Sequence, residues 1–129
     1  MPGLKRRVPA RPEEVGTLRH LVVAYAADAY PNAAAEFGDG IALAVTEACT
    51  NVVRHAYPDG GGEMTLTAWM DDPHLYVRIE DHGIGLDAPA GNPGLGLGLP
   101  LIAAHATLDI TSAGGTQLLM RFPRELPTT

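Results

Sequence analysis

The chain has 129 residues, of which 46% are hydrophobic and 19% charged, and its formal net charge is −6. This length is typical of one domain, and the composition excludes a disordered polymer. The acidic balance argues against sequence-independent binding to nucleic acid. The longest stretch with few charges is rich in Gly and Pro, which excludes a membrane-spanning helix. A basic start without a following apolar segment predicts no signal peptide, and the single cysteine, Cys49, fits a reducing cytoplasm.

The first half of the chain predicts two amphipathic helices. Residues 1–11 are expected to form a loose basic arm or an edge strand, and residues 12–129 a single domain. Pro12 and the two glutamates after it suit a first helical turn, and the helix would end before Pro31. Its apolar stripe comprises Val15, Leu18, Val22, Tyr25 and Ala29. The second helix is predicted from about Asp39 to Ala56, with the stripe Ile41, Val45, Ala48 and Val52.

The second half predicts mainly strands. Strict alternation indicates strands over 64–70 and 75–79, which a short turn joins into an antiparallel hairpin. Residues 81–98 are rich in glycine and predict an irregular loop, followed by a helix from Leu99 to about Ala106. Strands over 108–111 and 117–122 complete the chain. This order predicts an α+β fold, a two-layer α/β sandwich with a mostly antiparallel sheet and the helices on one face.

The second predicted helix carries a row of three polar residues. Glu47, Asn51 and His55 are four residues apart, so they share one face of the helix. A carboxylate, an amide oxygen and an imidazole in this arrangement would suit a metal ion or the activation of a hydroxyl. Taken alone, the row also fits a solvated helix face.

A second motif follows the hairpin. Asp81, Gly83 and Gly85 are spaced by two residues directly after a strand. The glycines would let the backbone approach a ligand closely, and the carboxylate would accept hydrogen bonds from a planar donor such as an exocyclic amine. An ordinary turn at the end of a strand is the alternative.

Two further glycine motifs follow. Gly94, Gly96 and Gly98 alternate just before the helix predicted at Leu99, where free N–H groups favour phosphate. This is neither a Walker loop nor a dinucleotide fingerprint, and a surface loop is the alternative. Two glycines also precede Thr116 at the start of the last predicted strand. A hairpin turn explains those glycines, and a hydroxyl that reaches a ligand is the functional reading of Thr116.

The order of the four motifs is more specific than any one of them. Glu-x-x-x-Asn on a helix, Asp-x-Gly-x-Gly after a strand, Gly-x-Gly-x-Gly before a helix and Gly-Thr before a strand resemble the GHKL ATPase/kinase superfamily. The resemblance covers roughly residues 41–122 and implies the Bergerat type of ATP-binding fold. The residues from Glu47 to Tyr57 are most similar to the anti-sigma-factor serine kinases, the RsbW/SpoIIAB-like group.

The resemblance implies a role for each motif. Glu47 would be the catalytic base that takes the proton of a serine hydroxyl. Asn51 would ligate Mg²⁺, and His55 would have a secondary role near the phosphates. Asp81 would accept the amino group of adenine, and Thr116 would support that network. Glycines would make room for the ring and close over the phosphates of ATP: Gly83, Gly85, Gly94, Gly96 and Gly98, with Leu99 after them.

The chain departs from this group in the segment expected to cover the phosphates. Several members carry an arginine there, whereas residues 86–93 contain neither Lys nor Arg. A missing cation would slow phosphoryl transfer by orders of magnitude, so the residues favour ATP binding more than transfer. Arg54, beside the polar row, is a candidate replacement.

Two functions are therefore predicted. The first is an ATP- and Mg²⁺-dependent serine/threonine kinase that phosphorylates a small anti-sigma-factor antagonist and binds a sigma factor. The first helix and the basic arm would hold the partners, and Arg19 would either meet an acidic partner or be a solvated surface charge. The alternative is a nucleotide-binding module that sequesters its partner without phosphorylating anything. The resemblance also implies a cytoplasmic homodimer formed through the sheet. Trp69 would pack under a helix or at the dimer contact.

Overall fold

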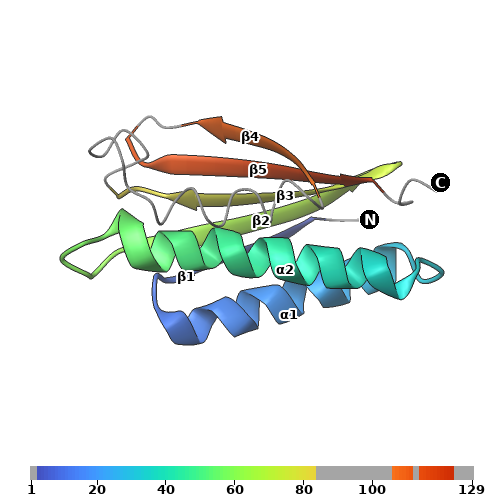
Figure 1. Ribbon diagram of the computed structural model, residues 1–129, viewed down its shortest axis with the longest axis horizontal. Helices are drawn as coiled ribbons and strands as arrows, with labels where there is room; N and C mark the ends of the chain where they lie inside the picture. Colours follow the sequence, from blue (N-terminus) through green and yellow to red (C-terminus); the bar gives the residue numbers. More distant parts are fainter. Residues whose placement is uncertain (1–2, 84–105, 112–113, 124–129) are drawn as a thin grey trace.

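The fold consists of two layers, with the helices on one face of a single sheet (Figure 1). A computed structural model describes residues 3–83, 106–111 and 114–123. The elements in chain order are β1 (Leu4–Pro9), α1 (Pro12–Ala29), α2 (Ala35–Asn51), the π-helix η1 (Val52–Ala56), β2 (Glu63–Asp71), β3 (His74–Asp81), β4 (Thr107–Thr111) and β5 (Thr116–Pro123). The predicted α+β sandwich is confirmed.

The sheet has five strands in the order β1-β2-β3-β5-β4, and every neighbouring pair is antiparallel. The basic arm forms the edge strand β1, paired with β2 from Leu4 opposite Ala68 to Pro9 opposite Glu63. Of the two alternatives for this arm, the edge strand is therefore correct. Strand β5 lies between β3 and β4, and this placement sets Thr116 opposite Asp81.

Helix α1 begins at Pro12 and ends at Ala29, as predicted. Its buried residues are Val15, Leu18, Val22 and Ala26. Tyr25 and Ala29 of the predicted stripe are half-buried and pack against the core. The stripe omitted Ala26, which a period of 3.6 residues turns inward and buries. None of the helices in the described ranges combines the length and the apolar character that crossing a bilayer requires.

Helix α2 begins at Ala35, four residues before the predicted start. Ala34 stands at its N-cap and makes no side-chain hydrogen bond there, so the usual capping signal is missing from the sequence. The predicted stripe is buried as expected. The last predicted turn is the π-helix η1, a wider and uncommon turn that is frequently found at functional sites.

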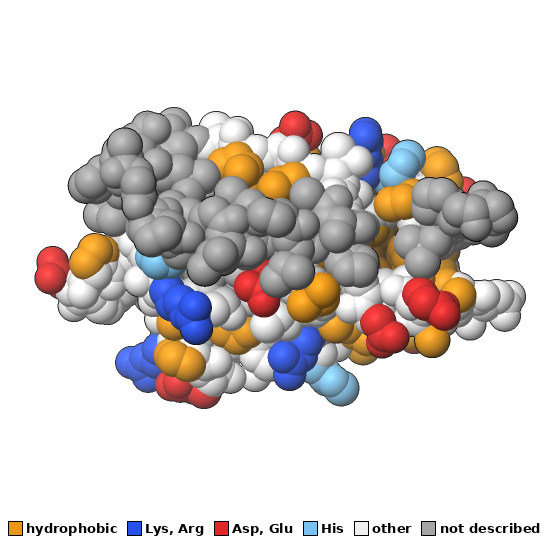
Figure 2. Space-filling view, in the orientation of Figure 1, with side chains coloured by type: hydrophobic (Ala, Val, Ile, Leu, Met, Phe, Trp, Pro, Cys, Tyr) orange, Lys and Arg blue, Asp and Glu red, His pale blue; other side chains and the backbone are white. Residues whose placement is uncertain are grey.

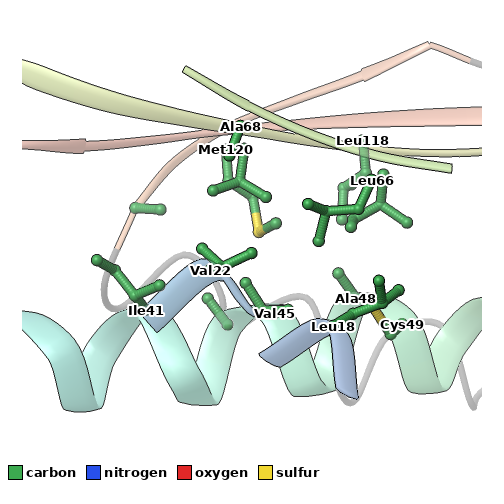
Figure 3. Close-up of a cluster of buried hydrophobic side chains, with 14 of the residues drawn as sticks. Leu18, Val22, Ile41, Val45, Ala48, Cys49, Leu66, Ala68, Leu118 and Met120 are labelled. Carbon is green, nitrogen blue, oxygen red and sulfur yellow. The ribbon is translucent and has the colours of Figure 1, made fainter. Parts of the chain in front are cut away.

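The core lies between the helices and the sheet. Inward residues of α1 and α2, such as Leu18 and Val45, meet inward residues of the strands, such as Leu66 and Met120 (Figure 3). These four side chains are fully buried. Burial of alternate residues along β2, β3 and β5 confirms the alternation found in the sequence.

Aromatic and charged residues gather on the sheet face that points away from the helices. Trp69 stacks on Tyr76, with 5.2 Å between ring centroids, and the guanidinium of Arg78 lies 5.3 Å from the centre of the Trp69 ring. Arg78 also donates a hydrogen bond from Nε to Glu80 Oε1. The expectation that Trp69 packs under a helix was wrong, because its neighbour Ala68 takes the inward position on β2.

Candidate functional site

Asp81, the last residue of β3, is the only buried charged or polar side chain among the described residues. Its Oδ1 accepts hydrogen bonds from two backbone N–H groups, those of Gly83 at 2.9 Å and Thr116 at 3.2 Å. The carboxylate thus connects the end of β3 to the start of β5. Both hydrogen bonds that the carboxylate accepts from described residues go to Oδ1, and Oδ2 accepts none from them.

Burial raises the pKa of the Asp81 carboxyl above its ordinary value. The two backbone hydrogen bonds and the nearby His82 act in the opposite direction and only partly offset this effect. A carboxylate with incomplete compensation gains more from an added hydrogen-bond donor than an exposed one would. A planar amine would supply such a donor, and the role of Asp81 in binding one stays a prediction.

Two glycines bring three segments into close contact around Asp81. A Cβ at Gly83 would overlap the carbonyl group of Ala56, and a Cβ at Gly115 would overlap the carbonyl oxygen of Asp81. Gly115 also has a backbone φ of 129°, a conformation that residues other than glycine rarely adopt. The residue type at both positions is thus set by packing, and the turn after β3 lies directly against the end of η1.

The polar row occupies the helix that ends at this contact. Glu47 and Asn51 are half-buried in the last two turns of α2, and His55 is half-buried in η1. The wider turn of the π-helix changes the angular position of His55 from the one predicted for a continuous α-helix. Contact between Ala56 and Gly83 joins the element that carries this row to the Asp81 turn.

Several predicted site residues lie outside the described residues. These are Gly85, Gly94, Gly96, Gly98 and Leu99. The segment without basic residues, 86–93, and nearly all of the helix predicted from Leu99 also lie outside them. Within the described part, the structure brings Asp81, Gly83 and Thr116 together and places Glu47, Asn51 and His55 on the adjoining helix.

The sequence analysis missed Tyr57, the residue that follows η1. Its hydroxyl donates a hydrogen bond to the carbonyl of Glu63 at 2.7 Å and accepts one from the N–H of His82 at 2.8 Å. The only signal in the sequence was its position next to the predicted site, since both partners depend on the fold.

The oxygen atoms of the side chains at this site fit a nucleotide with Mg²⁺. The Asp81 carboxylate can accept an amine, and the amide oxygen of Asn51 is a hard ligand of the kind that Mg²⁺ prefers. Glu47, one turn before Asn51, provides a carboxylate on the same helix. Mg²⁺ usually takes few ligands from the protein and completes its shell with phosphate and water. Within the described ranges, no three His, Cys, Asp or Glu side chains are grouped as ligands of another kind of metal site.

The fold and the site agree with a known class of domain. Residues 8–122 match the family described as histidine kinase-like ATPase domain. That match includes every described residue of the candidate site, from Glu47 to Thr116. The class is thus a GHKL-type ATPase domain, as the motifs indicated.

Relatives define the class more narrowly. The chain is 35% identical over 118 residues to the serine-protein kinase RsbW of Bacillus subtilis (strain 168), a match that covers 91% of this chain and 70% of that protein. RsbW of Bacillus velezensis is 33% identical over the same shares. RsbW of Bacillus cereus (strain ATCC 10987 / NRS 248) is 32% identical over 84 residues, and the chain spans about half its length. The chain therefore belongs to the RsbW-like group of GHKL serine kinases, an anti-sigma-factor kinase family.

Proposed function

We propose that this chain is an ATP- and Mg²⁺-dependent serine/threonine protein kinase that phosphorylates a small anti-sigma-factor antagonist and binds a sigma factor. The observation that carries the proposal is the buried Asp81 carboxylate, which accepts the N–H of Gly83, while Gly83 itself lies against Ala56 of η1, the continuation of the helix that bears Glu47 and Asn51. Relationship to the RsbW kinases supports the choice of reaction and partners. The proposal places the protein in the cytoplasm.

Each residue of the site has a stated task in this proposal. Asp81 accepts the amino group of adenine through Oδ2, and Thr116 helps to hold that carboxylate. Glu47 accepts the proton of the attacking serine hydroxyl, which raises the nucleophilicity of its oxygen. Asn51 ligates Mg²⁺, which neutralises phosphate charge when bound. His55 contacts the phosphate side.

Glycines outside the described residues complete the proposed site. Gly85 makes room for the base beside Gly83, and the N–H groups around Gly94, Gly96 and Gly98, before Leu99, contact the phosphates. Backbone donors of this kind bind phosphate without a side-chain cation, so nucleotide binding does not require a basic residue in segment 86–93.

A cleft between α1 on one side and the end of α2 with η1 on the other is the proposed partner surface. It has a volume of about 480 Å³ and is lined by residues that include Val15, Arg19, Thr50, Val53 and Arg54. Figure 2 shows basic side chains near the start of α1 and the end of α2. Two guanidinium groups above an apolar floor suit an acidic partner with an exposed apolar side chain.

We propose a second task for Arg54, because it lies beside the polar row, next to His55: it replaces the cation that segment 86–93 lacks. Substitution to Ala separates the two tasks. If Arg54 serves the reaction, Arg54→Ala slows phosphoryl transfer at saturating antagonist. If it serves only the partner cleft, the variant weakens antagonist binding and leaves the saturated rate unchanged. An unchanged rate would exclude the catalytic task.

We also propose a homodimer through the face of the sheet that carries Trp69, Tyr76 and Arg78. The stacked rings provide a flat aromatic surface that association would remove from water. Sedimentation of the wild-type chain and of Trp69→Ala tests this proposal. A monomeric wild type at micromolar concentration, or a dimer that the substitution leaves equally stable, would contradict it.

The decisive experiment measures transfer of labelled phosphate from ATP to candidate antagonist proteins. Glu47→Gln is the control, because the amide keeps the shape of the side chain and removes the base. Transfer by the wild type that the variant loses, with ATP affinity retained, supports the kinase. Transfer that survives in the variant contradicts the role of Glu47, and absence of ATP binding by the wild type contradicts the whole proposal.

The second candidate is a nucleotide-binding module that sequesters a sigma factor without kinase activity. The absence of Lys and Arg from residues 86–93 favours it, since a cation near the transferred phosphate accelerates such reactions by roughly 10³–10⁵. The same assay distinguishes the two candidates. ATP binding without transfer to any antagonist, together with nucleotide-dependent capture of a sigma factor, would identify the module.

A further inference from the structure

The hydroxyl of Tyr57 joins three segments: its own, the start of β2 six residues later, and the turn after β3, which is 25 residues away. Tyr57 is the first residue after η1, and its oxygen bonds to Glu63 at the start of β2 and to His82 after β3. It acts as a donor to the first and as an acceptor from the second, with both distances below 3 Å. This one atom therefore connects the end of the helix to both strands of the central hairpin.

The hydrogen bond to His82 completes the backbone at the end of β3. Pairing of β3 with β2 and β5 ends at Asp81, so the N–H of His82 has no partner in either ladder. The Tyr57 hydroxyl provides that partner. Gly83, the next residue, donates to the Asp81 carboxylate. Two hydrogen bonds thus hold the turn that orients the Asp81 side chain: one from the N–H of His82 to Tyr57, and one from the N–H of Gly83 to the Asp81 carboxylate.

Packing holds the Tyr57 ring in the position that these bonds require. A Cβ at Gly62 would overlap carbons of the ring, so only a glycine at this position allows the ring to lie against the chain. On the other side, Gly83 is in direct contact with the backbone of Ala56, the residue before Tyr57. Movement of the turn at residues 81–83 would therefore disturb η1, and movement of η1 would disturb the turn.

We propose that Tyr57 is a positioning residue that holds the base-recognising turn, Asp81 to Gly83, against the end of the helix that carries Glu47 and Asn51. It sets the distance between the side of the site that takes the purine base and the side that takes the phosphates. This inference rests on the proposed nucleotide-binding function. Tyr57 touches no reacting atom, so its effect acts on base-dependent binding through the direction of the Asp81 carboxylate.

The test compares Tyr57→Phe with Tyr30→Phe. Tyr30 is a matched control, since its hydroxyl also donates to a backbone carbonyl, that of His74, which lies at the other end of β3. Isothermal titration measures the affinity of each variant for ATP and for tripolyphosphate, both with Mg²⁺. We expect Tyr57→Phe to weaken ATP binding about tenfold and to leave tripolyphosphate binding unchanged, because phenylalanine keeps the ring and removes only the hydroxyl bonds. Tyr30→Phe should leave both affinities unchanged.

Two results would overturn this inference and leave the proposed nucleotide-binding function intact. One is ATP binding by Tyr57→Phe equal to that of the wild type, and the other is an equal loss for ATP and tripolyphosphate, which would indicate a general structural role. If the wild type binds no ATP, the proposed function fails and this inference fails with it.

Amide exchange gives a readout that does not depend on the variant. In the wild type without nucleotide, the His82 amide should exchange far more slowly than an exposed amide, because it donates to the Tyr57 hydroxyl. Exchange at the rate of an exposed amide would overturn the inference even if Tyr57→Phe failed to fold.

Discussion

Asp81→Asn separates the stability of the fold from recognition of the base. The amide oxygen of asparagine can still accept the N–H groups of Gly83 and Thr116, as Oδ1 of the carboxylate does. The second position changes from an acceptor to an NH₂ donor, which in the proposed complex would face the amino group of adenine. The substitution thus keeps the contacts within the protein and reverses the contact with the ligand.

The two effects have different sizes and directions. A hydrogen bond to a charged acceptor contributes about 1.5–3 kcal/mol, so ATP affinity should fall by about 10- to 150-fold. Stability at neutral pH should not fall, since burial raises the pKa of Asp81 and the ionised carboxylate is therefore disfavoured in the folded chain. Asp81→Asn should unfold at an equal or higher urea concentration than the wild type.

The pH dependence follows from the direction of the pKa shift. A carboxyl with a raised pKa contributes stability that is fully present below the pKa of the unfolded chain and is lost as the pH rises through the higher folded value. The stability of the wild type relative to Asp81→Asn should therefore decrease from acid toward neutral pH. The ATP affinity of the wild type should increase over the same window, because the ionised form is the better acceptor.

Urea denaturation and isothermal titration of both proteins across this pH range check the argument. Use of the difference between the two proteins cancels the titration of the other carboxylates. An Asp81→Asn variant that binds ATP as well as the wild type would refute the role of Oδ2. A variant that loses 2 kcal/mol or more of stability at neutral pH would refute the view that burial dominates the energetics of this carboxyl.

Three other predictions concern the core, the thiol and the turn beside the site. Leu18→Ala removes a fully buried side chain of α1 and should reduce the free energy of unfolding by about 2–5 kcal/mol, measured in urea; a loss below 1 kcal/mol would contradict the packing described. Burial raises the pKa of the Cys49 thiol to about 12, so a thiol reagent at pH 8 should label it only when the chain unfolds, and rapid labelling of the native protein would argue against that burial. Gly115→Ala should cost at least about 1–3 kcal/mol and weaken ATP binding, because its Cβ would displace the Asp81 carbonyl. Gly38→Ala, where a Cβ meets nothing within 4 Å, should raise stability by up to about 1 kcal/mol; equal effects of the two substitutions would contradict the local geometry.

Local patterns in the sequence predicted most of the fold. The stripe of α1 and the alternation of β2 and β3 depend on which residues face the core, and that is visible as periodicity. The early start of α2 was missed because Ala34 gives no capping signal. The sequence did not decide between a loose arm and an edge strand at β1, because Val8 is the only buried residue of this strand and the others are mainly exposed.

The candidate site was predicted in part for the same reason. Asp81 and Gly83 belong to a local motif, which spacing marked as a candidate and which the order of the four motifs then linked to a known family. The π-helix η1 has no recognised sequence signal, and the task of Tyr57 depends on a partner 25 residues away. Contacts of that kind arise from the strand order, which periodicity does not reveal.

The position of β5 has a consequence for the chain as it is synthesised. This strand follows the other described elements in the sequence, yet it lies between β3 and β4 in the sheet. While the ribosome is still elongating the chain, Asp81 has already emerged, whereas the Thr116 amide that holds it has not. A nascent chain that ends before β5 thus lacks one of the two hydrogen bonds to the Asp81 carboxylate. A nucleotide that binds the proposed site would therefore stabilise only chains in which β5 has paired with β3.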